Sequence, residues 1–247
     1  MGGFVTPPTS IQVAAPPPFY IAFSTRIGGV SKGAFSSLNL GLLTEDEPSL
    51  VFKNREALLA SLGTKASHAS MCHQVHGSTV VQANSPGIDV NRVHPKSDGI
   101  WTESQEDPVV VLSADCVPIA LCRLGENPAV AAVHAGWRGL LSGVVAAAVQ
   151  ALGSSDLHAF IGPAIGQCCY PVSKSIAELF QKRFGNRVVK FGHVDLVLAS
   201  HCALQESGIS KIEIINACTS CESDRFFSHR RDNGQTGRQG LVAFIKN

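Results

Sequence analysis

The sequence predicts one α/β domain built of stacked layers. Segments with strand character alternate with segments of helical periodicity through the middle of the chain, which is typical of such domains. Hydrophobic residues make up 45% of the 247 residues and charged residues only 16%, so the chain can bury a large core. No internal repeat and no shift in composition divides residues 19–247, and this length is within the range of a single domain.

The first part of the chain is predicted to hold an arm, a strand, a loop and a helix. Residues 1–18 contain five prolines and no periodic pattern, so we expect a Pro-rich N-terminal arm. Residues 19–23 are rich in β-forming side chains and predict a strand. Residues 27–41 are rich in glycine and serine and predict a loop. Residues 48–62 begin with a proline, carry an apolar face and precede a glycine, which predicts a helix.

The rest of the chain is predicted to continue with short strands and three more helices. Apolar runs bounded by turn residues predict the strands, and amphipathic or Ala-rich runs predict the helices. The predicted strands are residues 78–82, 109–113, 119–122, 129–134, 157–161 and 212–216. The predicted helices are residues 140–152, 173–184 and 195–208.

Composition and charge exclude several classes of function. Twenty basic residues against nineteen acidic ones leave a net charge of +1, and aromatic residues make up 6%, so a nucleic-acid partner is not expected. The longest apolar stretch, residues 109–122, is interrupted by Asp115 and is too short to span a membrane. The N-terminus lacks the basic region and apolar core of a signal peptide. We therefore expect a cytoplasmic protein without membrane association.

The eight cysteines are expected to be reduced, because disulfide frameworks are typical of small secreted chains. Cys218 and Cys221 form a lone C-x-x-C motif, and the other cysteines offer no second pair at a spacing suited to zinc. We expect Cys218 and Cys221 to be packed residues that are dispensable for activity. The adjacent Cys168 and Cys169 are likewise expected to be structural.

Four polar clusters follow apolar segments, where α/β folds tend to place their sites. They comprise residues 73–77, 113–116, 134–139 and the tail 226–238. The first three supply histidines, a cysteine and a carboxylate, which suit either a Cys/His zinc site or a Cys–His nucleophile pair. Of His73 and His76, only one is expected to be a ligand, because a predicted strand follows directly.

Residues 24–29 form a candidate anion site. Arg26 offers a guanidinium group, and Gly28 and Gly29 allow backbone amides to approach an anion closely. Further cationic side chains near the polar clusters are Arg138, Arg230 and Arg231. For each arginine, the alternative is a solvated position or pairing with a carboxylate.

A longer set of motifs runs in order from about residue 19 to the end of the chain. The motifs are Ser24-Thr25-Arg26 with Gly28-Gly29-Val30-Ser31, Ser37-Leu38-Asn39-Leu40-Gly41, Asn54-Arg55, Gln74-Val75-His76-Gly77, Asp98-Gly99-Ile100-Trp101-Thr102, Ala114-Asp115-Cys116-Val117-Pro118, His134-Ala135-Gly136-Trp137-Arg138-Gly139, Ile161-Gly162-Pro163-Ala164-Ile165 and Ser228-His229-Arg230-Arg231-Asp232. Together they resemble the bacterial YfiH/YlmD family. Members of that family have been called multicopper polyphenol oxidoreductases, or laccase-domain proteins, and also purine nucleoside phosphorylases.

The resemblance implies one α/β domain with sheets packed between helices, and a zinc ion held by His76, Cys116 and His134. It implies phosphorolysis of adenosine, inosine, guanosine and methylthioadenosine, together with deamination of adenosine. Purine nucleosides and phosphate are then the expected partners, and no obligate protein partner is expected. The laccase name implies copper in place of zinc. One departure is Pro171, which stands where the family usually has a glutamate after Cys-Tyr.

Other residues are assigned candidate roles around such a site. A zinc ion with three protein ligands keeps an open position, where water loses a proton near neutral pH and can attack adenine. Asp115, beside Cys116, is the candidate carboxylate for orienting a ligand or handling a proton. Arg26 is the first candidate for holding phosphate, followed by Arg55 and Arg138. A further candidate substrate contact is Asn39.

Three alternatives stay open at this point. A copper polyphenol oxidoreductase needs a cluster of many histidines, and the nine histidines here are scattered, although copper binds thiolate–imidazole sites more tightly than zinc. A metal-free hydrolase or deamidase would use Cys116 as nucleophile and His134 as base. A non-enzymatic binding module would leave the polar clusters apart in space.

Overall fold

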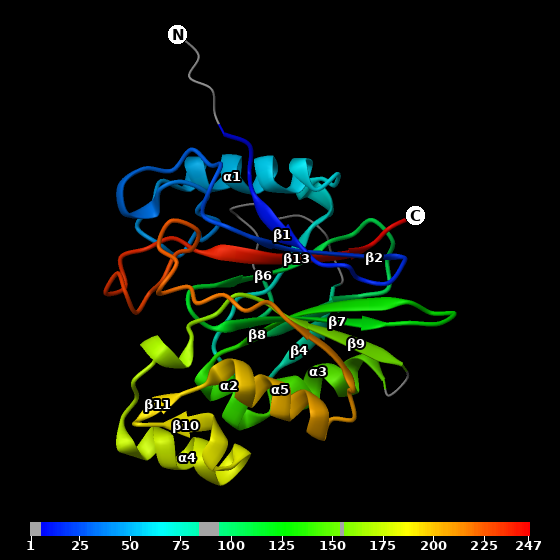
Figure 1. The fold of residues 1–247 in the computed structure, drawn as a ribbon. Coiled ribbons are helices and arrows are strands. Elements are labelled where there is room, and N and C mark those ends of the chain that lie inside the picture. Colours follow the sequence, from blue (N-terminus) through cyan, green and yellow to red (C-terminus); the bar gives the residue numbers. More distant parts are fainter. Residues whose placement is uncertain (1–5, 84–93, 154–155) are drawn as a thin grey trace.

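The computed structural model describes residues 6–83, 94–153 and 156–247. Two β-sheets stack face to face, and helices cover the outer face of each, which makes four layers (Figure 1). This is the layered α/β fold that the sequence predicts. No helix in the described ranges is long and apolar enough to span a bilayer.

The first sheet has five strands, in the spatial order β1-β2-β13-β6-β3. Its strands are β1 (Ser10–Gln12), β2 (Phe19–Ser24), β3 (Ser70–Met71), β6 (Val109–Ser113) and β13 (Gln239–Ile245). The second sheet has six strands, in the order β12-β9-β7-β8-β5-β4. Its strands are β4 (Val80–Gln82), β5 (Gly99–Thr102), β7 (Val117–Arg123), β8 (Ala129–Ala135), β9 (Leu157–Ile161) and β12 (Lys211–Ile214).

The helices divide between the two outer faces. Helix α1 (Pro48–Ser61) covers the five-stranded sheet, while the others pack below the six-stranded sheet (Figure 1). The latter are α2 (Trp137–Ser142), α3 (Val144–Leu152), α4 (Lys174–Phe184) and α5 (Leu196–Glu206). Short 3₁₀ turns are η1 (Gly33–Phe35), η2 (Ala66–His68), η3 (Gln167–Cys169) and η4 (Asn186–Val188), and a two-stranded ribbon joins β10 (Val189–Lys190) to β11 (His193–Val194).

The central strands are buried on both faces, which explains why they read as continuous apolar runs. In β6, Val109 and Val111 face the layer between the sheets, whereas Val110 faces α1. In β7, Ile119 packs toward the helices and Ala120 toward the other sheet. Each strand therefore contributes alternate residues to two cores, as the period-2 geometry of a strand requires.

Several elements differ from those predicted. The predicted helix over residues 140–152 is two helices, because Gly143 adopts a left-handed conformation with φ of 88° and breaks the run. The arm is not loose throughout, since Ser10–Gln12 pairs with β2. The sequence analysis also missed β13, the central strand of the first sheet, although Leu241 to Ile245 are fully or almost fully buried.

Candidate metal centre

Two connections carry the chain from one sheet to the other past the end of β8, and both bear predicted site residues. The segment from β3 to β4 contains His76, and the segment from β6 to β7 contains Asp115 and Cys116. His134 lies next to the end of β8. A cleft of about 1120 Å³ opens there, and all four side chains line it.

The structure brings His76, Cys116 and His134 together. One ligand atom from each lies within 4.8 Å of the others, which is close enough for a single ion to contact all three. The two imidazole rings meet edge to face, with their centroids 4.9 Å apart. His73 lines the same cleft but does not belong to this group. The choice of His76 over His73 therefore agrees with the geometry.

A buried carboxylate, Asp98, holds the side chain of His134 and the backbone at His76. Its Oδ1 accepts hydrogen bonds from the backbone N–H of His76 (2.9 Å) and from Nδ1 of His134 (2.9 Å). Its Oδ2 accepts from the N–H groups of Val75 (3.2 Å) and Gly77 (2.6 Å). Because an ionised carboxylate only accepts, His134 carries its proton on Nδ1 and directs Nε2 away from Asp98. The carboxylate that orients a candidate ligand is thus Asp98, not Asp115 as the sequence analysis expected.

The local backbone is shaped around this group. His76 has a φ of 60°, a left-handed conformation that costs a non-glycine residue about 1–3 kcal/mol. The three N–H groups directed at Asp98 hold the segment in that conformation. Gly136 lies on the other side, where a Cβ atom would come within 3.0 Å of Cys116 Sγ and 3.1 Å of His76 Cδ2. A glycine at position 136 therefore keeps the space beside the candidate ligands open.

The ionisable groups of Cys116, His134 and Asp98 shift one another's pKa values in the metal-free protein. Burial alone would raise the pKa of Cys116, but the charges and hydrogen bonds of His134 and His76 lower it to about 6. Burial would lower the pKa of His134, but Cys116 and Asp98 raise it to about 9. Burial likewise opposes ionisation of Asp98, yet the bonds from His134, Gly77 and His76 hold its pKa below the usual value. At neutral pH the site is a thiolate beside an imidazolium.

Asp115 makes its hydrogen bonds to other segments of the chain. Its Oδ1 accepts from the hydroxyl of Thr219 (2.7 Å), and its Oδ2 accepts from the backbone N–H of Arg230 (2.9 Å). Its backbone carbonyl accepts from the N–H of Ile165 (3.0 Å). Asp115 therefore joins the β6–β7 connection to the tail of the chain and to the loop after β9.

Cationic side chains line the cleft near its rim and floor. Arg55 is buried, and its Nε donates to the carbonyl of Leu40 (2.8 Å), whereas its Nη1 has no hydrogen-bond partner. Burial lowers the pKa of Arg55 to about 10, which still leaves it charged at neutral pH. Arg238 lies on the other side of Leu40, whose N–H donates to the carbonyl of Arg238 (3.0 Å). Burial lowers the pKa of Arg238, and the negative charges of Asp115 and Cys116 oppose that shift.

Arg138 also lines the cleft. Its guanidinium lies 4.4 Å from the centre of the Trp137 ring. Two other predicted contacts, Arg26 and Asn39, are not among the described residues that line it. The guanidinium of Arg26 donates to the carbonyls of Ser36 and Ser223 and lies 4.5 Å from the centre of the Phe227 ring. Each of its three guanidinium nitrogens thus donates to a backbone carbonyl, and its place away from the cleft does not support the expectation that Arg26 holds phosphate.

Asn39 is a positioning residue rather than a substrate contact. Its Oδ1 accepts from the N–H groups of Gly41 and Arg238 (2.9 Å each). Its amide nitrogen donates to Thr44 Oγ1 (3.0 Å) and Asp46 Oδ2 (2.9 Å). All its polar atoms are engaged with the loop that lines one wall of the cleft, which corrects its predicted role.

Pro171 follows Tyr170, a residue that lines the cleft. The Pro171 carbonyl accepts a hydrogen bond from Arg230 Nη1 (2.8 Å), and the Arg230 guanidinium lies 4.7 Å from the centre of the Tyr170 ring. A glutamate at position 171 could pair with Arg230 through its side chain, whereas here the contact is made by the backbone.

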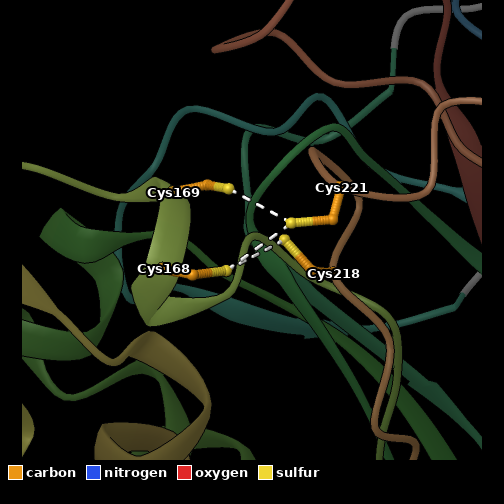
Figure 2. Close-up of side chains that lie close together, drawn as sticks. All are labelled: Cys168, Cys169, Cys218 and Cys221. Atoms are coloured by element: carbon orange, nitrogen blue, oxygen red, sulfur yellow. Dashed lines mark hydrogen bonds between the residues drawn. The ribbon is translucent and has the colours of Figure 1, made fainter.

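The lone C-x-x-C motif does have a second pair. Cys168, Cys169, Cys218 and Cys221 converge on one point (Figure 2). The expectation that no other cysteines complete this motif is therefore wrong, because adjacent residues on η3 supply them from about fifty positions earlier in the chain.

Comparison with known proteins places these features in a family. The profile of the family described as "Multi-copper polyphenol oxidoreductase laccase" matches residues 20–246. "Purine nucleoside phosphorylase YlmD" of Geobacillus stearothermophilus is 34% identical, over 93% of this chain and 91% of that protein. "Purine nucleoside phosphorylase YfiH" of Escherichia coli K12 is 35% identical, over 90% of this chain and 91% of that protein. The crystal structure of the Bacillus licheniformis hypothetical protein YfiH superposes with a TM-score of 0.91 at 29% identity, covering 97% of each chain.

Proposed function

This chain belongs to the multi-copper polyphenol oxidoreductase laccase family, and from that premise we propose that it is a purine nucleoside phosphorylase. Its substrates would be adenosine, inosine, guanosine or methylthioadenosine, together with phosphate. Phosphate attacks C1′ of the ribose and the bond from C1′ to the base nitrogen breaks. The products are the free purine and ribose 1-phosphate, or 5-methylthioribose 1-phosphate when the substrate is methylthioadenosine. We include adenosine deamination in the proposal, in which water replaces the 6-amino group and ammonia leaves.

The observation that carries the proposal is the convergence of His76, Cys116 and His134 in a cleft large enough for a nucleoside. Two imidazoles and a thiolate are a donor set that suits Zn²⁺, and copper accepts the same donors. When bound by three protein ligands, zinc retains an open position and brings the pKa of a water there close to neutral.

The chain's own residues would prepare this site. Asp98 keeps the proton of His134 on Nδ1, so that Nε2 is available as a ligand. The same carboxylate holds the His76 backbone in its left-handed conformation. Because Asp98 is fully buried and accepts four hydrogen bonds, the imidazole of His134 and the backbone at His76 are held in place before any ligand binds.

Phosphate would bind at Arg55 and Arg238 in this proposal. Arg55 carries a buried guanidinium nitrogen without a partner, and burying an unpaired donor is costly unless a ligand satisfies it. Arg238 lines the same cleft as Cys116, so an anion held by its guanidinium would share that cleft with the candidate metal centre. The aromatic side chains of Tyr170 and Trp137 line the same cleft and offer faces for a purine ring.

Product analysis tests the proposal. The purified protein, with its metal content measured, is given adenosine with and without phosphate, and the products are separated. We expect adenine and ribose 1-phosphate only when phosphate is present, and inosine in both conditions. Absence of any phosphate-dependent release of base from all four nucleosides would refute the proposed activity.

One observation favours a second candidate, a metal-free Cys–His hydrolase or deamidase. The thiolate of Cys116, the imidazolium of His134 and the carboxylate of Asp98 are arranged as a nucleophile already deprotonated by the histidine base, a proton donor for the leaving group and an orienting carboxylate. That activity would survive chelation, whereas the metal-dependent reaction would not. A copper oxidase is less well supported, because within the described ranges the only groups of possible metal ligands are this one and the four cysteines.

A further inference from the structure

The four cysteines lie outside the cleft and on two separate segments. Cys168 and Cys169 are in η3, after the loop that follows β9, and Cys218 and Cys221 are in the turn after β12. Backbone hydrogen bonds join the two segments: Ala164 N–H donates to the Ala217 carbonyl (3.4 Å), and Thr219 N–H donates to the Ala164 carbonyl (3.0 Å). These backbone hydrogen bonds hold the two pairs of cysteines close together.

The spacing of the sulfur atoms matches a single tetrahedral ion. The Sγ atom of Cys168 lies 3.8 Å from that of Cys218 and 3.7 Å from that of Cys221, and Cys169 Sγ lies 3.4 Å from Cys221 Sγ (Figure 2). All four lie within 4.8 Å of one another. A zinc ion with four thiolates at about 2.3 Å places the sulfurs about 3.8 Å apart. No two sulfurs are set apart as a disulfide pair, since Cys168 and Cys221 each approach two partners.

The surroundings of Cys218 suit a thiolate. Its Sγ accepts from the N–H of Gly166 (3.2 Å), and backbone amides of Gly166 and of its own turn lower the pKa of Cys218 against the effect of burial. The guanidinium of Arg231 donates to the carbonyl of Thr219 (2.8 Å), which places a cation on the turn between Cys218 and Cys221. The amide donor on Cys218 Sγ and the nearby Arg231, whose charge is shared with Asp232, favour the negative charge of a metal–thiolate centre at this end of the cluster.

We propose that Cys168, Cys169, Cys218 and Cys221 form a structural Zn²⁺ site, separate from the His76/Cys116/His134 centre. Four cysteine ligands leave no open position, so the site is closed and has no role in chemistry. It ties η3, and with it Tyr170 in the wall of the cleft, to the turn that contains Thr219, whose hydroxyl holds Asp115. Cys168 and Cys221 are exposed, which gives the ion access from solvent.

Metal analysis in variants tests the site independently of the proposed function. The His76→Ala/Cys116→Ala protein, purified under reducing conditions, should retain stoichiometric zinc. Adding Cys218→Ser and Cys221→Ser to that protein should remove the zinc, whereas the control Cys202→Ala, which removes a buried thiol elsewhere, should leave it bound. Loss of all zinc from the first variant would overturn the proposal without touching the question of phosphorylase activity.

A second measurement uses the unchanged protein, in case the serine variants do not fold. Cys168 and Cys221 are exposed, yet they should resist alkylation until a chelator is added, and the melting temperature should fall by more than about 5 °C on chelation. Replacing zinc by Co²⁺ should give the intense absorption of cobalt bound to thiolates, also in the His76→Ala/Cys116→Ala protein. Rapid alkylation of Cys168 and Cys221 before chelation, or disulfides among the four cysteines in protein purified under reducing conditions, would contradict the assignment.

Discussion

Substitution of Asp98 by asparagine tests how the candidate ligands are positioned. The carboxylate accepts two hydrogen bonds on each oxygen, from His76 and His134 on Oδ1 and from Val75 and Gly77 on Oδ2. An amide has only one oxygen, so in either orientation its NH₂ group faces two of these partners. Each lost bond to a charged, buried acceptor costs about 1.5–3 kcal/mol, which gives a loss of about 3–6 kcal/mol in unfolding free energy.

The same change should weaken metal binding about 10- to 100-fold. With NH₂ facing His134, the ring would move its proton to Nε2, the nitrogen needed as a ligand. Chelator competition measures the affinity, and denaturant unfolding measures the stability. The matched control is Asp156→Asn, which removes an exposed carboxylate paired with Lys211 and should change stability by less than about 1 kcal/mol. If Asp98→Asn kept both the stability and the metal affinity of the parent, the positioning role of Asp98 would be wrong.

Substitutions at Gly136, Arg55 and Arg26, and a pH titration of Cys116, test the cleft further. Gly136→Ala should lower metal affinity while the fold survives, because its new Cβ would lie 3.0 Å from Cys116 Sγ; the metal content of the folded variant checks this. Arg55→Met should raise the KM for phosphate at least about tenfold, whereas Arg26→Ala should mainly lower the melting temperature; steady-state kinetics at varied phosphate separates the two. In the chelated protein, alkylation of Cys116 should follow a midpoint near pH 6, and a midpoint at the usual thiol pKa would contradict the thiolate–imidazolium pair.

The pH dependence of stability in the metal-free protein follows from the same pair. Cys116 has a lowered pKa, so its contribution is present above its unfolded pKa and is lost as pH falls through about 6. His134 has a raised pKa, so its contribution is present below its unfolded pKa and is lost as pH rises through about 9. Between these limits the folded and unfolded states bind nearly equal numbers of protons at the pair, and its effect on stability should be almost flat.

Local sequence patterns predicted the elements whose burial is regular. The strands Val109–Ser113 and Leu157–Ile161 match the predicted bounds, because uninterrupted apolar runs between turn residues have few other solutions. The final strand, Gln239–Ile245, was missed even though it pairs with both β2 and β6. Its apolar run over residues 241–245 is of the kind that predicted the other strands, whereas its central place between β2 and β6 depends on partners more than a hundred residues away.

The candidate site was likewise predicted from the sequence only in part. His76, Cys116 and His134 were identified by the family resemblance, whereas the residues alone left His73 and His76 unresolved. Asp98 was noted only within a family motif and was given no role in the site. Its burial, a consequence of its position between two strands, is what gives it four hydrogen bonds. The cysteine cluster was not predicted because its two pairs lie about 50 residues apart in the chain and meet only through the packing of two loops.

Base release measured on one preparation before and after metal removal tests the central claim most directly. Adenosine and phosphate are supplied to the purified protein, to the same protein after chelation at the His76/Cys116/His134 centre, and to the chelated protein after zinc is returned. The account predicts that phosphate-dependent release of adenine is lost on chelation and recovers in proportion to the zinc restored, and that a Cys116→Ala protein never recovers it. Undiminished adenine release from the fully chelated protein, or from folded Cys116→Ala, would contradict it.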